Sequence, residues 1–285
     1  MASSAKLTSF PYATALRQEL ILRSRAFASN HALAHQETYG DLPVICYLPN
    51  QANSAHGNFL PETYRSILKN DNWRLRLEKV HTQARVSLPK ADRRWRELDS
   101  CNSSDALLMN IFCFPGALKN HRVFDLLGIE RWQKPYFGLK ARVPLLHQKS
   151  DRTEVDMRLG NLLVEAKLTE SDFQTAPCAV LDTYRDFHEI FDTRRLPRDT
   201  NRYLSYQLIR NVLAAYANDC SFCVMADARR PDLMEAWYAV MQAVRLIDLR
   251  LRCKMITWQE LSSVLPRKLR AFLHEKYGIA TGDPA

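Results

Sequence analysis

The stretch from Thr153 to Leu168 constrains the fold of this chain more than any other. Polar and apolar residues alternate along Glu154–Leu159 and, after the apolar pair Leu162-Leu163, along Val164–Leu168. The dipeptide Gly160-Asn161 separates the two runs. Alternation with a period of two predicts strands, and a dipeptide such as Gly-Asn between two strands predicts a tight turn that joins them. The sequence therefore predicts an antiparallel β-hairpin.

The turn fixes which residues of this hairpin face each other. If the dipeptide occupies the two central turn positions, Asp156 lies opposite Glu165, and Glu154 lies opposite Lys167. Opposed Cβ atoms are only about 4.5–5.5 Å apart, and like charges at that distance destabilise a sheet. A divalent cation would offset the repulsion, because carboxylate oxygens suit Mg²⁺. The alternative is a solvated hairpin with one cross-strand ion pair, Glu154 with Lys167.

The other face of the hairpin is apolar throughout. A continuous apolar stripe is expected where one side of a sheet packs on a core. The stripe consists of Val155, Met157, Leu159, Leu162, Val164, Ala166 and Leu168.

Helical and strand-like patterns alternate on both sides of the hairpin. Ser103 and Ser104 can cap a helix that starts at Asp105. The other predicted elements are a strand over 136–146, a helix over 202–218, a strand over 221–226, a helix over 232–246, a strand over 249–257 and a helix over 266–276. This order predicts an α/β fold whose mixed sheet has helices on its faces.

The first hundred residues look helical and irregular, with predicted helices over 11–28, 61–69 and 72–80. We therefore expect two parts, a helical accessory region over 1–100 and a core over 101–285 that ends in a C-terminal helix.

The charge of the chain favours a polyanionic partner. The net charge is +9 and the pI is about 9.3, and phosphate neutralisation supplies most of the non-specific affinity for nucleic acid. Trp95 lies among Arg93, Arg94 and Arg96, a pattern that could stack on a base and hold a backbone. A solvated helix anchored in the core by Trp95 explains the same pattern.

Other features bear on location. No window approaches 18 uninterrupted apolar residues, and the start, Met1 to Lys6, does not resemble a signal peptide. The 7 cysteines are scattered along the chain. We expect a reduced, cytoplasmic protein that does not enter a membrane.

Four of the cysteines allow a second kind of site. Cys220 and Cys223 form a CxxC pair, and Cys178 and Cys253 would complete four ligands for a metal ion or cluster. The pair, however, flanks or enters a strand that looks buried, and cysteine is among the most buried residue types. We interpret these thiols as core residues, with the metal site as the alternative.

Asp156 followed by Glu165-Ala-Lys167 on the next strand resembles the signature of the PD-(D/E)xK nuclease superfamily, which includes restriction endonucleases. Val155 stands where a proline usually precedes the acid. Residues 56–260 more broadly resemble a bacterial branch of restriction-endonuclease-like proteins. That likeness lies in Ser103-Ser104 ahead of Asn110-Ile-Phe112, in Glu165–Glu170 and in Tyr206–Asn211. The resemblance implies a restriction-endonuclease-like core of αβββαβ order.

The resemblance also implies roles for individual residues. Asp156, Glu165 and the main-chain carbonyl of Ala166 would bind Mg²⁺ or Mn²⁺. Lys167 would position or activate a water and stabilise charge on the phosphate.

Two helices supply accessory candidates on the same grounds. Gln207 corresponds to a polar residue that many relatives place beside the site, and Asp105 to an additional acid. The plainer interpretations are a solvent-facing glutamine and a first-turn acid favoured by the helix dipole.

These observations predict a metal-dependent nuclease that cleaves nucleic acid, DNA rather than RNA on family grounds, and acts as an endonuclease rather than an exonuclease. Whether it forms a homodimer stays open. The competing interpretation is a catalytically inactive nuclease-fold module that binds nucleic acid. The intact set of Asp156, Glu165 and Lys167 argues against it.

Overall fold

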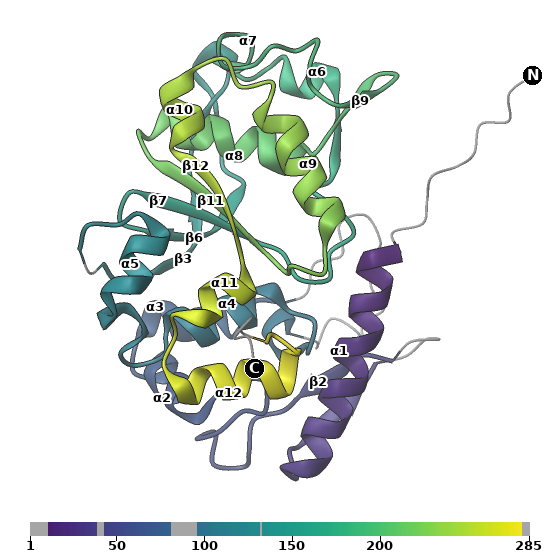
Figure 1. Ribbon diagram of the computed structural model, residues 1–285, viewed down its shortest axis with the longest axis vertical. Helices are drawn as coiled ribbons and strands as arrows, with labels where there is room; N and C mark the ends of the chain where they lie inside the picture. Colours follow the sequence, from purple (N-terminus) through teal and green to yellow (C-terminus); the bar gives the residue numbers. More distant parts are fainter. Residues whose placement is uncertain (1–10, 39–42, 81–95, 132, 281–285) are drawn as a thin grey trace, which may run out of the picture.

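The computed structural model describes residues 11–38, 43–80, 96–131 and 133–280. These residues include a mixed sheet of five strands in the order β12-β11-β7-β6-β3 (Figure 1). β3, β6 and β7 are antiparallel neighbours, whereas β7, β11 and β12 run parallel. The strands are β3 (Tyr136–Lys140), β6 (Glu154–Leu159), β7 (Leu162–Ala166), β11 (Ser221–Ala226) and β12 (Cys253–Thr257). The predicted α/β class with a mixed sheet is confirmed.

One face of this sheet is covered by helices from both ends of the chain, which lie together below the sheet in Figure 1. α1 packs against α12, and both share a hydrophobic cluster with Met157, Leu159 and Val164 of the hairpin. The helices that contribute to this cluster are α1 (Pro11–Asn30), α4 (Ser104–Phe112), α5 (His121–Leu127), α11 (Trp258–Ser263) and α12 (Arg267–Tyr277).

The other face is covered by consecutive helices from the second half of the chain. Val155 and Leu163 of the hairpin join this second cluster. Its helices are α6 (Cys178–Leu181), α7 (Phe187–Ile190), α8 (Tyr206–Ala217), α9 (Pro231–Met241) and α10 (Ile247–Leu251). The predicted apolar stripe is therefore only part of the burial, because all five residues of β7 are buried between two layers.

Short elements complete the described structure. The first hundred residues contain α2 (Pro61–Leu68), α3 (Asp71–Arg76) and a small sheet of β1 (His35–Glu37) and β2 (Ile45–Tyr47) that the sequence analysis did not predict. Further small sheets consist of β4 (Val143–Pro144) with β5 (Ser150–Asp151), and of β8 (Thr175–Pro177), β10 (Arg202–Leu204) and β9 (Arg198–Asp199). No helix within the described ranges is long and apolar enough to cross a membrane. The division at residue 100 stays a prediction.

Several predicted bounds were wrong. The helix expected over 202–218 begins only at Tyr206, because Ser205 adopts a left-handed conformation (φ 58°) and Tyr203 pairs with Ala176 in β10–β8. The first three residues of the strand expected over 249–257 belong to α10, which ends at Leu251, and β12 begins only at Cys253. The helix expected over 232–246 ends at Met241, and the strand expected over 136–146 breaks after Lys140. The prediction for Trp95 falls outside the described residues.

Candidate active site

The candidate site lies where the ladder between β6 and β7 ends. Leu159 pairs with Leu162 and Arg158 with Leu163, as the turn predicted, and the regular pairing continues only to Met157 with Val164. One step further along the strands are Asp156 and Glu165. Here the Ala166 amide donates a hydrogen bond to Asp156 Oδ2 at 2.8 Å, in place of a regular cross-strand bond. The two predicted acids thus meet at the open end of the hairpin.

Asp156 carries a strongly perturbed carboxyl group. Burial raises its pKa well above the usual range, and the carboxylates of Glu165 and Asp105 raise it further. Asp156 is nevertheless only half-buried by accessible surface, so solvent or a ligand can reach it. A group with a perturbed pKa that is still accessible is typical of a functional site.

Lys167 pairs with Glu165, and not with Glu154 as in the alternative interpretation of the hairpin. Its Nζ lies 2.6 Å from Oε1 of Glu165, and both side chains are buried, with 4% and 2% of their residue surfaces exposed. The cross-strand pair of Glu154 with Lys167 is wrong, because β7 ends before Lys167 and the Glu154 carboxylate binds Arg76 at 2.9 Å. Burial alone would lower the pKa of Lys167, but nearby carboxylates, Glu165 first, raise it. The ammonium therefore stays charged.

Helix α8 supplies an amide to the site. Asn211 Nδ2 donates to Glu165 Oε2 at 2.8 Å, and Arg210 fixes Asn211 by donating to its Oδ1 at 2.8 Å. Gln207, the residue predicted for this role, lies one turn earlier on the same helix. Its Oε1 is buried and accepts no hydrogen bond from the described residues. The sequence analysis missed Asn211, although the spacing of four residues from Gln207 places both on one helix face.

Asp105 is close enough to Asp156 to raise its pKa, but it is already paired. Ser103 caps α4 by accepting from the Ala106 amide, which places Asp105 in the first turn. Its carboxylate is 2.8 Å from Arg76 and 3.0 Å from Lys79. Burial alone would raise the pKa of Asp105, yet these two cations lower it.

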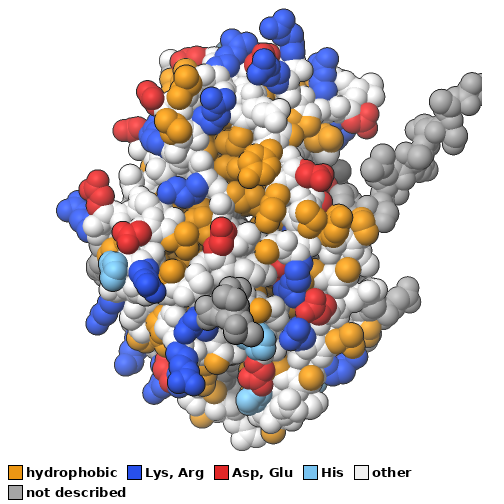
Figure 2. Space-filling view, in the orientation of Figure 1, with side chains coloured by type: hydrophobic (Ala, Val, Ile, Leu, Met, Phe, Trp, Pro, Cys, Tyr) orange, Lys and Arg blue, Asp and Glu red, His pale blue; other side chains and the backbone are white. Residues whose placement is uncertain are grey.

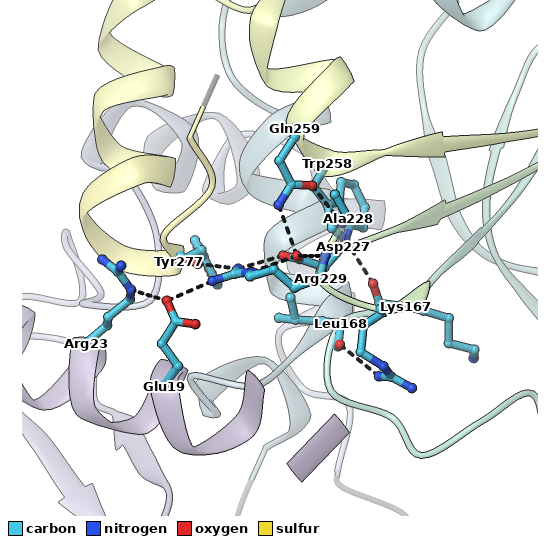
Figure 3. A network of polar contacts seen from close by, with 11 residues as sticks. Glu19, Arg23, Lys167, Leu168, Asp227, Ala228, Arg229, Trp258, Gln259 and Tyr277 are labelled. Atoms are coloured by element: carbon cyan, nitrogen blue, oxygen red, sulfur yellow. Dashed lines mark hydrogen bonds and ion pairs between the residues drawn. The ribbon is translucent and has the colours of Figure 1, made fainter. Parts of the chain in front are cut away.

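The main chain around Lys167 is held by residues that follow β11 and β12. Trp258 Nε1 donates to the Lys167 carbonyl at 2.9 Å, and the Lys167 side chain points away from the neighbouring ion cluster of Arg229 (Figure 3). Buried Arg230 donates to the carbonyls of Leu168, Glu170 and Ser171 at 3.2, 2.7 and 3.0 Å. Sequence reasoning found neither Trp258 nor Arg230, because their contacts join segments about 60 and 90 residues apart.

The neighbouring cluster extends to the first helix. Arg229 binds Asp227 at 2.7 Å and Glu19 of α1 at 2.8 Å, and Gln259 also donates to Asp227 (Figure 3). The chain segment that carries Arg230 is therefore fixed to α1 by an ion pair.

Other candidate ligands are not gathered. Among the described residues, no three His, Cys, Asp or Glu side chains form a ready-made metal-binding group. Cys220, which directly precedes β11, and Cys223 within it are buried, as we expected of a pair that flanks or enters a buried strand, while Cys178 and Cys253 are partly exposed.

Comparison with known proteins adds one finding to this geometry. No curated protein and no solved structure matches the chain. A family model described as "Restriction Endonuclease associating with ARP" matches residues 23–278, a wider span than the 56–260 that the sequence motifs had indicated. The match covers most of the chain and includes the hairpin with Asp156, Glu165 and Lys167. The chain therefore belongs to this restriction-endonuclease family.

Proposed function

We propose that this chain is a metal-dependent endonuclease that hydrolyses phosphodiester bonds of DNA, with Asp156, Glu165 and Lys167 as its reactive centre. The observation that carries the proposal is the meeting of two carboxylates at the open end of the hairpin, with a charged lysine on one of them. The family match supports the nuclease class.

The donors present fit a weakly held divalent cation. Asp156 and Glu165 are hard oxygen donors, and the pKa of Asp156 is raised first by burial and then by the carboxylates of Glu165 and Asp105. Mg²⁺ characteristically keeps several waters and uses one or two carboxylates plus substrate phosphate, so two carboxylates and the Ala166 carbonyl suffice. When bound, such an ion supplies charge that polarises the phosphate and acidifies water.

The other side chains have distinct proposed tasks. Lys167, held protonated, stabilises the negative charge that develops on the phosphate and orients it, and it does not serve as the base. Asn211 orients Glu165 through its 2.8 Å hydrogen bond. Gln207 offers a buried acceptor to which no described residue donates, suited to orienting a water. Asp105 acts as an additional acid beside Asp156, with its charge balanced by Arg76 and Lys79.

A cleavage assay on plasmid and single-stranded DNA, with Mg²⁺ and Mn²⁺ titrated, tests the proposal. Lys167→Ala should lose on the order of 10²–10³ in rate, the usual loss when one preorganised electrostatic partner is removed. Lys119→Ala, on an exposed lysine, is the matched control, and thermal melting of each variant excludes unfolding as the cause.

Two outcomes would contradict the proposal. Cleavage at the wild-type rate by folded Lys167→Ala would remove Lys167 from the mechanism. DNA binding without cleavage, at any metal concentration and on both substrates, would instead identify an inactive nucleic-acid-binding module.

A further inference from the structure

A cavity of about 370 Å³ lies outside the centre described above, beside the small sheet β4–β5. The described residues that line it are basic or uncharged, and none of them is Asp or Glu. The lining consists of Arg142, Pro144, Leu145, Leu146, His147, Gln148, Lys149, Ser150 and Arg185. On the face seen in Figure 2, by contrast, Lys and Arg side chains are scattered with acidic ones among them.

The cations of this cavity are available to a ligand. Arg142 and Lys149 are exposed and form no ion pair with any described residue. Arg185 is also exposed, and its guanidinium is oriented by Asp186 at 2.7 Å. Asp186 thus offsets part of the charge of Arg185, whereas Arg142 and Lys149 have no acid paired with them among the described residues. Positive groups that line a partly enclosed space attract anions, because their charges add there.

The wall of the cavity is a fixed loop. The Leu145 amide donates to the Lys149 carbonyl at 2.9 Å, and the Leu146 amide donates to Thr183 at 2.8 Å. Arg142, His147 and Gln148 have left-handed φ values of 52°, 60° and 58°. Strained residues of this kind persist only where the surrounding structure enforces them, so the basic side chains project from a defined frame.

The cavity also lies close to the candidate active site along the chain. Ser150 is six residues before Asp156, and six extended residues span at most about 20 Å. That is roughly six base-pair steps at 3.4 Å per step. The frame is joined to α8 as well, because Tyr184 OH contacts both Asp151 at 2.7 Å and Tyr206 at 2.8 Å.

We propose that the cavity of Arg142, Lys149 and Arg185 binds a backbone phosphate of the nucleic-acid substrate, a few nucleotides away from the bond that is cut. The proposal rests on the proposed nuclease function. It assigns the cavity to positioning the substrate and to no step of the chemistry.

The test compares two double variants that lose the same charge. Arg142→Gln/Lys149→Gln changes the cavity, and Lys119→Gln/Arg122→Gln changes two exposed cations that do not line it. Dissociation constants for a 20-base-pair duplex are measured over a salt series. The cavity variant should reduce the slope of log K against log salt by about 1, as expected when one phosphate contact is lost, while the control keeps the wild-type slope.

Further measurements separate the outcomes. Equal slopes for the two double variants would overturn the inference, and wild-type cleavage in the same experiment would leave the nuclease function standing. Absence of DNA cleavage by the wild type would contradict the function itself. Inorganic phosphate is titrated alone by calorimetry. Tight phosphate binding that duplex DNA does not displace would assign the cavity to a free anion and so also overturn the inference.

Discussion

Asp105 and Asp156 are neighbouring carboxylates, yet their pKa values shift in opposite directions. Asp105 is buried with Arg76 and Lys79, and its pKa is lowered. Asp156 accepts a hydrogen bond from the Ala166 amide, and the ammonium of Lys167 forms its ion pair with Glu165. The pKa of Asp156 is raised. Of these two carboxylates, Asp156 is the one whose negative charge is not balanced by an ion pair of its own. The proposed divalent cation would therefore bind beside Asp156, whereas Asp105 is already paired with Arg76 and Lys79.

The largest expected effect on stability comes from replacing Asp105, the carboxylate that is paired with two cations. Asp105→Asn leaves the buried guanidinium of Arg76 with one acid fewer, so the free energy of unfolding should fall by about 3 kcal/mol, the lower end of the cost of breaking a buried pair. Urea denaturation at pH 7 measures it. Glu97→Gln, which removes only the more exposed partner of Lys79, is the control and should cost under about 1 kcal/mol. Equal losses of unfolding free energy in the two variants would mean that the ion pairs of Asp105 stabilise the fold no more than that of Glu97.

Replacing Asp156 should change the free energy of unfolding in the opposite direction. Asp156→Asn removes a carboxylate whose ionisation the fold disfavours, because burial and the carboxylates of Glu165 and Asp105 raise its pKa. The metal-free protein should therefore become more stable in the same urea denaturation, by less than Asp105→Asn loses. The wild type should bind Mn²⁺ in a calorimetric titration, and the same variant should lose that binding. A destabilised Asp156→Asn protein that still binds Mn²⁺ would reverse the comparison.

The smallest effect concerns pH. Because the pKa of Asp156 is raised in the folded state, its carboxyl group lowers stability progressively as pH rises from about 4 through that pKa. Asp105 behaves oppositely, since its contribution is present above its unfolded pKa and is lost as pH falls through the lower folded value. The stability gained by Asp156→Asn should therefore grow with pH, and Mn²⁺ affinity of the wild type should rise over the same window. A gain that is constant between pH 4 and 9 would contradict the raised pKa.

Local patterns in the sequence predicted part of the site. The period of two and the turn dipeptide were sufficient to place Asp156 and Glu165 at matching positions, because register in a tight hairpin is a local property. The orientation of Lys167 was not predictable in this way, because β7 ends one residue before it and the partner strand no longer faces it.

The supporting contacts depend on tertiary structure. Arg76 comes from α3, Asn211 from α8, Arg230 from the segment after β11, and Trp258 from α11. Each reaches the hairpin across many residues, and no periodicity in the sequence records such distances. The predicted start of α8 was wrong for a related reason. Pairing of Tyr203 with Ala176 in β10–β8, not local propensity, decides where α8 begins.

The packing of α1 on α12 bears on how the protein is made. Leu16 and Leu20 near the start share one cluster with Leu269 and Phe272 near the end. During synthesis on the ribosome, the second cluster can close once β12 has emerged, whereas the first must wait for the last helix. Apolar surface that stays uncovered during translation is prone to aggregation, and contacts between distant segments form slowly. We therefore expect nascent chains that stop before α12 to need a chaperone to remain soluble.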